Sequence, residues 1–260
     1  MTTTAVREVA DIAPITRDND ARVHALAAYD LLLDLLERLG PDDWDRRVPD
    51  CPAWTVADCV GHMIGAGRGH ANPAQQVRQL VVGRLRASRF DGNDTDAMND
   101  LQVRDHAALS PHERVAALRR VAPRAVAGRM RAPGFVRRRS IPIPQSGSWG
   151  PNDPPSLNLG HLMDAVLTRD VWMHRLDIAR ATGRGVVLDH PTDARVVEDV
   201  VAEWASRHGQ PVELVLDGPA GGTFRAGSGG PRLELDTVAF VRAVSGRDPG
   251  EGLLATHVLF

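Results

Sequence analysis

Apolar residues recur at helical spacing in four long segments of the chain, and this pattern predicts four amphipathic helices. The segments are about 18–38, from Thr55 onward with a continuation over 80–88, about 110–130, and 159–183. Helix start signals support them: Thr55 with Asp58 forms a loose capping box, and Ser110 is followed by proline at the first helical position. Four long helices with uneven connections favour a four-helix bundle, a frame that builds metal sites between facing helices.

The pattern changes after residue 184. We expect a helix from Thr192 to about 208, then a short helix capped by Asp236-Thr237. Short β-like runs separated by turn signals lie at 211–216, 221–226 and 231–235, and the final LLATHVLF predicts a further strand. The fold class is therefore mainly α, a four-helix bundle over 17–184 followed by a small α+β C-terminal domain over 185–260.

Three remaining segments show no clear periodic spacing of apolar residues. The N-terminal segment 1–16 is expected to be poorly ordered or loosely docked. The segment 91–108 is polar and acidic and predicts a loop with a short helical piece. The segment 132–155 is rich in proline, glycine and serine and predicts a connection outside the core.

The most informative chemistry lies in the fourth predicted helix. Asp170 and His174 are four residues apart. At 3.6 residues per turn, this spacing stacks both side chains on one face of the helix. The second helix carries His62. Two imidazoles and one carboxylate from two packed helices would form a three-ligand site with coordination positions left open, as a catalytic metal requires.

Other interpretations of the same residues stay open at this stage. A histidine on a helix is usually a satisfied or exposed side chain, and Asp170 is also suited to a surface ion pair. Asp58, one turn before His62, either caps its helix or orients the imidazole. The offset of His161 from His174 places it well round the helix, whereas His106 lies in a polar segment that could reach the mouth of the bundle.

Composition narrows the possible chemistry. The hydrophobic content of 43% and the charged content of 25% are typical of a globular protein. All 31 basic residues are arginine, so a Schiff-base or Walker lysine is excluded. The net charge of −2 gives no general attraction to nucleic acid. No apolar run approaches the roughly 20 residues of a membrane helix, and we expect no secretory signal and a cytoplasmic protein without a disulfide framework.

Two segments resemble the mycothiol-dependent maleylpyruvate isomerase family. The run VPDCPAWTVADCVGHM, residues 48–63, is similar to the family's P-x-W-[ST]-V-x-D-x-x-x-H signature, which places the first metal-ligand histidine. The run RDVWMHRLDIARATGR, residues 169–184, resembles its last bundle helix, where an acid-x-x-x-His pair supplies the other two ligands. The resemblance spans about residues 20–258 and is looser in the C-terminal part.

This resemblance implies a DinB-like four-helix bundle with a divalent metal, Zn²⁺ in most cases, held by His62, Asp170 and His174. It implies that the thiol cofactor mycothiol binds near the metal. Mycothiol belongs to actinobacteria, which agrees with the all-arginine, GC-rich coding. Isomerases of the family commonly have glutamate where this chain has Asp170, and the shorter side chain would draw the metal toward the fourth helix or require a bridging water.

Further site residues are expected from the same resemblance. Arg247, and secondarily Arg242, are candidate catalytic cations from the C-terminal domain for a developing enolate oxygen. Arg175 is a candidate for binding an anionic substrate or cofactor, with a salt bridge as the alternative. Trp172 is a candidate pocket wall, whereas Trp54 is expected to pack in the bundle.

The leading hypothesis is a mycothiol-dependent metalloenzyme, an isomerase or S-transferase acting on a small, electrophilic and anionic substrate. In an isomerase, thiolate addition would turn a C=C bond into a single bond, and rotation and elimination would follow. Two alternatives remain: a hydrolase or lyase that uses metal-activated water without a thiol, and a non-catalytic binding or regulatory protein. We expect a small-molecule partner, no nucleic acid, no membrane, and a monomer or homodimer.

Overall fold

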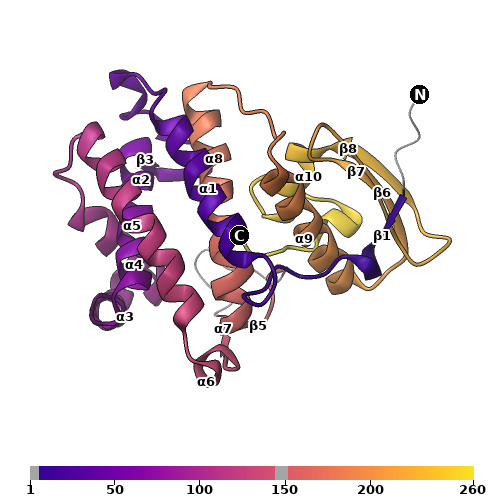
Figure 1. The fold of residues 1–260 in the computed structure, drawn as a ribbon, viewed down its shortest axis with the longest axis horizontal. Helices are drawn as coiled ribbons and strands as arrows, with labels where there is room; N and C mark the ends of the chain where they lie inside the picture. Colours follow the sequence, from indigo (N-terminus) through magenta and orange to yellow (C-terminus); the bar gives the residue numbers. More distant parts are fainter. Residues whose placement is uncertain (1–5, 144–151) are drawn as a thin grey trace.

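The computed structural model describes residues 6–143 and 152–260, and these form a mainly helical fold with small sheets, as predicted. Figure 1 shows the long helices gathered on one side and a sheet with α9 and α10 on the other. The principal helices are α1 (Ala21–Leu36), α2 (Val56–Ala71), α3 (Pro73–Arg86), α4 (Asp94–Asp105), α5 (Pro111–Arg131), α8 (Leu167–Thr182), α9 (Pro191–His208) and α10 (Thr237–Val244). No helix of these described residues combines the length and hydropathy needed to cross a bilayer.

Four helices pack around the main core. Helix α2 lies along α5, α1 contacts both α5 and α8, and α2 also touches α8 (Figure 1). The predicted start of α2 is present, because Thr55 caps the helix and the Asp58 carboxylate accepts from Thr55 N at 3.0 Å. Asp58 is thus a capping residue. The apolar faces bury aliphatic and aromatic side chains, among them Leu32, Leu35, Val60, Ile64, Leu118 and Trp172.

The segment 91–108 is more ordered than its composition predicts. It forms helix α4, capped by Asn93, whose side chain accepts from the amides of Thr95 and Asp96. Only a narrow face of α4 is buried, and one of its members is the polar Gln102. This explains why a hydrophobic period did not reveal the helix. Helix α4 packs closely against α2, where a Cβ on Gly65 would lie 2.5 Å from that of Gln102.

The fourth predicted helix is interrupted. It consists of α7 (Leu159–His161), a π-helical segment η4 (Leu162–Val166), and then α8. Gly183, with a left-handed φ of 67°, ends α8 as expected from the sequence. His161 does not join the predicted ligands, because its Nε2 lies 3.0 Å from a Glu203 carboxylate oxygen.

The connection over 132–155 holds a short helix and one strand, and part of it (144–151) lies outside the described residues. Helix α6 (Gly134–Arg137) follows α5, and strand β4 (Ser140–Pro142) pairs antiparallel with β5 (Ser156–Asn158). A second two-stranded sheet joins β2 (Arg47–Val48) to β3 (Cys51–Thr55) directly before α2.

Three strands of the C-terminal part and the N-terminal strand β1 (Val6–Glu8) form a four-stranded sheet in the order β1-β7-β6-β8. Strand β6 (Val212–Asp217) pairs antiparallel with β7 (Gly222–Ala226) and parallel with β8 (Arg232–Asp236), so the three predicted runs are all strands. The final LLATHVLF is not a strand. It begins as a 3-10 helix, η5 (Gly252–Ala255), and its last residues are irregular, with Val258 N bonded to Val244 O at 2.8 Å.

The prediction of a loosely docked N-terminal segment is wrong from Val6 onward, while positions 1–5 lie outside the described part of the chain. Strand β1 (Val6–Glu8) pairs parallel with β7 (Figure 1). Ile15 is buried, and its amide donates to Asp199 Oδ1 at 2.8 Å. This segment thus crosses from the sheet to the bundle, whereas the division of the chain into domains at 184/185 stays a prediction.

A buried ion cluster connects α8 to α9 and to the C-terminal residues. Arg169 is 0% exposed and binds Asp199 through Nη2 at 2.6 Å and Glu203 through Nη1 at 2.7 Å. Its Nη1 also donates to Leu259 O at 3.1 Å. Burial tends to raise the pKa of Glu203, but Arg169 and His161 outweigh it and lower the pKa to about 2. Glu203 is therefore ionised at neutral pH.

We expect Asp199→Asn to lower the free energy of unfolding by about 3–5 kcal/mol, because it leaves the Arg169 guanidinium buried without its closest carboxylate. Urea denaturation followed by circular dichroism measures this. Arg119→Gln, which removes an exposed ion pair to Glu37, is the control and should cost less than about 1 kcal/mol. If Asp199→Asn lowered the free energy of unfolding no more than the control does, the ion cluster around Arg169 would not stabilise the fold as described.

Candidate metal centre

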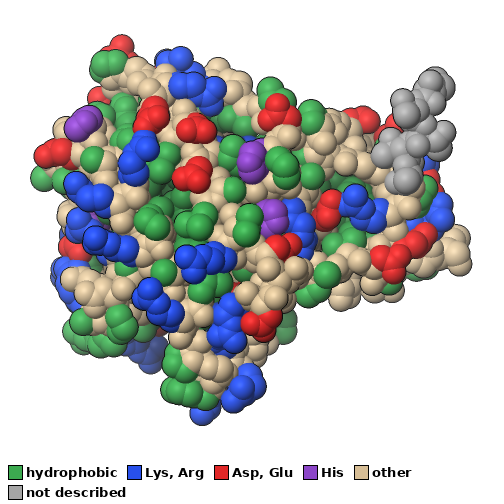
Figure 2. All heavy atoms as spheres, viewed as in Figure 1, with side chains coloured by type: hydrophobic (Ala, Val, Ile, Leu, Met, Phe, Trp, Pro, Cys, Tyr) green, Lys and Arg blue, Asp and Glu red, His purple; other side chains and the backbone are tan. Residues whose placement is uncertain are grey.

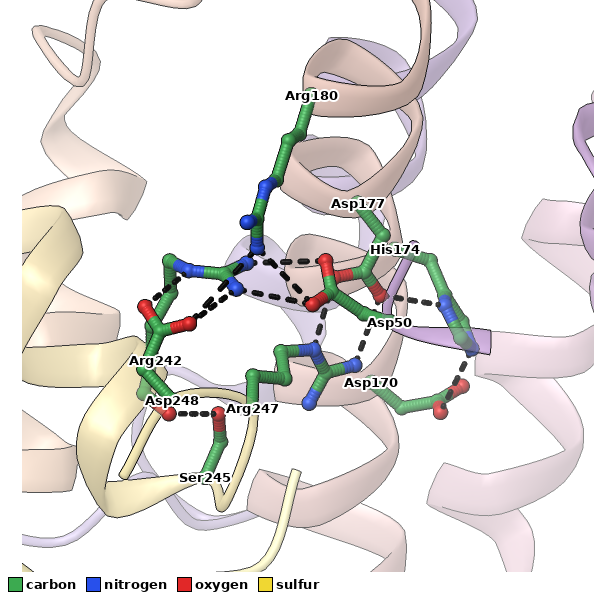
Figure 3. Close-up of polar contacts among 9 residues, drawn as sticks. All are labelled: Asp50, Asp170, His174, Asp177, Arg180, Arg242, Ser245, Arg247 and Asp248. Atoms are coloured by element: carbon green, nitrogen blue, oxygen red, sulfur yellow. Dashed lines mark hydrogen bonds and ion pairs between the residues drawn. The ribbon is translucent and has the colours of Figure 1, made fainter. Parts of the chain in front are cut away.

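The structure brings His62, Asp170 and His174 together from α2 and α8. One ligating atom from each residue lies within 4.8 Å of the other two. His174 Nε2 is 3.5 Å from Asp170 Oδ1, and the two imidazole centroids are 5.5 Å apart. Figure 3 shows Asp170 and His174 one turn apart on the same face of α8. Asp170 reaches the cluster although its side chain is one methylene shorter than glutamate.

A chain of side-chain amides fixes the His62 imidazole. Gln79 Nε2 donates to Gly65 O at 2.8 Å, so Gln79 Oε1 is free to accept from Gln102 Nε2 at 3.0 Å. Gln102 Oε1 then accepts from His62 Nδ1 at 2.8 Å. This direction of donation places the proton on Nδ1 and leaves the lone pair of His62 on Nε2, the tautomer that binds a metal through Nε2.

The other imidazole is fixed by the C-terminal part of the chain. His174 Nδ1 lies 3.0 Å from Asp177 Oδ2. The same carboxylate accepts two hydrogen bonds of 2.8 Å from Nε and Nη2 of Arg247, as Figure 3 shows. Asp177 therefore holds the ring orientation of His174, and Arg247 holds Asp177.

Trp54 lies against both imidazoles. Its ring centroid is 5.0 Å from that of His62 and 6.5 Å from that of His174. Strand β3 places it there, immediately before the Thr55 cap of α2. Trp54 also packs against the main core, as predicted from the sequence. Its position directly before the cap of the helix that carries His62 was the available signal that it borders the site.

The protonation states differ between the two histidines. Burial lowers the pKa of His62 to about 4, so its imidazole is neutral and available as a ligand. Burial also opposes charging of His174, but Cys59, Asp170 and the hydrogen bond with Asp177 together raise its pKa well above the usual value. The raised pKa favours a proton on Nε2 of His174, the nitrogen that faces Asp170, and a divalent cation would replace this proton.

A second group of potential ligands shares His174. Atoms of Cys51, His174 and Asp177 also lie within 4.8 Å of one another. Burial raises the pKa of the Cys51 thiol to about 11, which disfavours the thiolate that a metal needs. A cation at this second group would also compete with Arg247 for Asp177. The geometry therefore favours the group with His62 and Asp170.

Arg242 lies in a separate ion-pair network and not at the three-residue cluster. Its Nη1 and Nη2 bind Asp50 at 3.0 and 2.9 Å, and its Nε and Nη2 bind Asp248 at 2.7 and 2.8 Å. Arg180 of α8 joins the same carboxylate of Asp50 at 3.1 Å (Figure 3). These contacts fasten α10 to the loop before β3 and to α8, so Arg242 supports the interface.

Trp172 and Arg175 face another side of α8. Trp172 is fully buried, and its Nε1 donates to Asp193 Oδ1 at 2.7 Å. Arg175 Nη2 binds the same oxygen at 2.8 Å. Both side chains therefore link α8 to the first turn of α9, and the structure does not bring them to the histidine cluster. His106 is also not at the mouth of the bundle, because it is buried at the end of α4 and bonded to Gln102 O.

The donor set fits a divalent transition metal. Two imidazole nitrogens and one carboxylate oxygen are ligands typical of Zn²⁺, and three protein ligands leave a coordination position for another molecule. Both histidines are oriented by hydrogen bonds through Nδ1, which is the usual support of a metal-binding histidine. The fold and cluster together define a mainly helical protein with a candidate metal centre.

Comparison with known proteins agrees with this description. Residues 25–179 match the family model described as the mycothiol maleylpyruvate isomerase N-terminal domain, and the chain belongs to this family. Two crystal structures share the fold, those of the mycothiol-dependent maleylpyruvate isomerase and of a histidine-to-alanine mutant of it. Their TM-scores are 0.54 and 0.53 at 15% and 14% identity, covering 95% of this chain and 93% of each other chain. A comparison with curated proteins found no match.

We expect Asp177→Asn to weaken Zn²⁺ binding about 10- to 100-fold, because the His174 ring loses the charged acceptor that orients it. Competition with a chelating dye measures this on metal-stripped protein. Asp18→Asn is the matched control, since the exposed Asp18 carboxylate pairs with Arg17 and takes no part in the cluster, and it should stay within about threefold of the wild type.

His174→Ala should abolish stoichiometric metal binding in the same titration. Equal and negligible metal in the wild type and in His174→Ala would contradict a metal site at this cluster.

Proposed function

We propose that this protein is a divalent-metal-dependent and mycothiol-dependent isomerase or S-transferase that acts on a small electrophilic substrate. The observation that carries the proposal is the convergence of His62, Asp170 and His174 within the region that matches the family. The solved structures with this fold are of an isomerase that depends on mycothiol. Zinc is the metal that the donor set favours.

Each ligand residue has a defined part in holding the metal. His62 presents Nε2, because the amide chain through Gln102 keeps the proton on Nδ1. His174 presents Nε2 on the side of Asp170, because Nδ1 is bonded to Asp177. When bound, a divalent metal lowers the pKa of a coordinated thiol, so that thiolate is available at neutral pH.

Exposure indicates the side from which thiol and substrate approach. The Asp170 side chain is 27% exposed, whereas that of His174 is 7% exposed. Trp54 covers the two imidazoles and shields them from water. We therefore expect the small molecules to reach the centre beside Asp170.

Arg247 acts through Asp177 in this proposal. Two hydrogen bonds link its guanidinium to the carboxylate that orients His174, so it is a positioning residue of the centre. A direct contact of Arg247 with an enolate oxygen, as the family resemblance implies, stays a prediction. Arg242 contributes by fixing the C-terminal part on the bundle.

The surface suits a protein that works on small molecules. The face drawn in Figure 2 intersperses arginine and acidic side chains with hydrophobic ones and has no continuous basic stripe. Mixed charge of this kind gives no footprint for nucleic acid. We propose a small-molecule substrate, no nucleic-acid or membrane partner, a cytoplasmic location, and a monomer or homodimer.

The test is an isomerisation assay on the purified, zinc-loaded protein with maleylpyruvate as substrate. We expect turnover only with added mycothiol, loss of turnover after chelation, and recovery with Zn²⁺. His174→Ala should reduce the rate to background, whereas His112→Ala, an exposed histidine on α5, should leave it unchanged.

The outcomes separate the alternatives. Hydrolysis or lyase activity that persists without any thiol would replace the proposal with metal-activated water. Zinc and mycothiol bound without turnover on any activated double bond or alkylating substrate would indicate a non-catalytic binding protein.

A further inference from the structure

The guanidinium of one buried arginine in the bundle has no hydrogen-bond partner among residues 6–143 and 152–260. Arg129, near the end of α5, is 3% exposed. Its Nε, Nη1 and Nη2 are all buried, and none has an acceptor among the described residues. No carboxylate of residues 6–143 or 152–260 lies within the 4.0 Å of an ion pair with it. A guanidinium stays protonated in proteins, so this is a full charge without a partner.

The other buried arginines of the bundle show that this is unusual. On the same helix, Arg114 donates to the carbonyls of Ala57 and Ala107 at 2.8 and 3.2 Å. Arg137 is paired with Asp164, and Arg169 with Asp199 and Glu203. Burying an unpaired charge costs several kcal/mol. A group kept at such a cost is expected to serve a ligand.

Arg129 interacts electrostatically with the carboxylate of the candidate metal centre. Burial lowers the pKa of Arg129, and the charges that counteract this lowering belong to Tyr29 of α1, Asp170 of α8 and Asp164 of η4. His70, at the end of α2, interacts with both Arg129 and Asp170. The guanidinium therefore shares the bundle interior with Asp170 and interacts with it without a direct bond.

The charged groups around Arg129, counted together with a bound metal, have a net positive charge. His62 and His174 would each bind a metal through the lone pair of a neutral imidazole and so add no charge. Asp164 is neutralised by Arg137. A divalent metal, Asp170 and Arg129 then sum to two positive charges. A thiolate balances one of them, and the second remains for a further anionic group next to Arg129.

We propose that Arg129 is the anion-binding residue of this site and holds a carboxylate group of the substrate beside Asp170. The inference rests on the proposed function and adds to it the residue that would bind the negatively charged end of the substrate. Five N–H donors in a planar fork match a carboxylate in two parallel hydrogen bonds. A carboxylate bound in this way would accept from two of the three side-chain nitrogens that have no acceptor in the described part of the chain.

Maleate, a small planar dicarboxylate, serves as the binding probe. Isothermal titration measures its affinity for the full-length protein with and without one equivalent of Zn²⁺, in the absence of thiol. We expect Arg129→Met to lower the affinity about 10- to 100-fold in both states, the loss that follows from removing a charged bidentate partner. Arg124→Met, an exposed position on the same helix, is the matched control and should bind as the wild type does. Uncharged maleamide should bind at least tenfold more weakly than maleate.

Thermal unfolding separates a ligand-binding arginine from a structural one. Arg129→Met removes a charge that has no partner, so its melting temperature should equal or exceed that of the wild type. Arg114→Met removes hydrogen bonds to two carbonyls and should melt at a lower temperature. An Arg129→Met protein that fails to fold or melts well below the wild type would assign the guanidinium to the fold and overturn the inference.

The remaining outcomes also decide the question. Maleate affinity that is unchanged in Arg129→Met, or absent in the wild type with and without zinc, overturns the inference even if the protein is an active isomerase. Maleate binding that depends on Arg129 supports it even if no thiol-dependent turnover is found. Arg129→Lys keeps the positive charge but loses the planar guanidinium with its paired N–H donors. It should retain part of the affinity for maleate.

Discussion

The carboxylate of Asp177 is shared between the His174 imidazole and the Arg247 guanidinium, and this one group joins the candidate metal centre to the C-terminal part of the chain. Asp177 is 0% exposed, and the two partners hold its pKa far below the usual value although burial opposes ionisation. The negative charge is therefore permanent, and it fixes the ring on which the centre depends. The neighbouring contacts of Arg242 with Asp50 and Asp248 hold α10 in the position that brings Arg247 to Asp177.

The centre is supported equally by close helix packing on its other side. Helix α2 has glycine at positions 61, 65 and 69, and at Gly65 the absence of a side chain lets Gln102 of α4 approach His62. A substitution at Gly65 would push α4 away and break the amide chain that sets the His62 tautomer. The polar helix α4 therefore belongs to the surroundings of the candidate site through Gln102.

The sequence predicted the parts of the fold and site that depend on local pattern. The caps at Thr55 and Ser110, the long helices and the strands of the C-terminal sheet follow from short-range signals. The four-residue spacing of Asp170 and His174 placed both on one face of α8. Contacts that form only through tertiary packing were not predictable in this way. Gln102 meets His62, and Arg247 meets Asp177, only once the separate helices have packed. Strand β1 likewise forms only because β7, near the other end of the chain, offers it an edge.

The central claim is that two imidazoles and one carboxylate, and neither cysteine, are the protein ligands of a bound metal. X-ray absorption at the zinc edge of the loaded protein tests it most directly. Without added thiol, we predict only nitrogen and oxygen neighbours at about 2.0–2.2 Å, and one sulfur at about 2.3 Å after mycothiol is added. A sulfur neighbour before any thiol is added would place the metal on Cys51 or Cys59 and contradict the account.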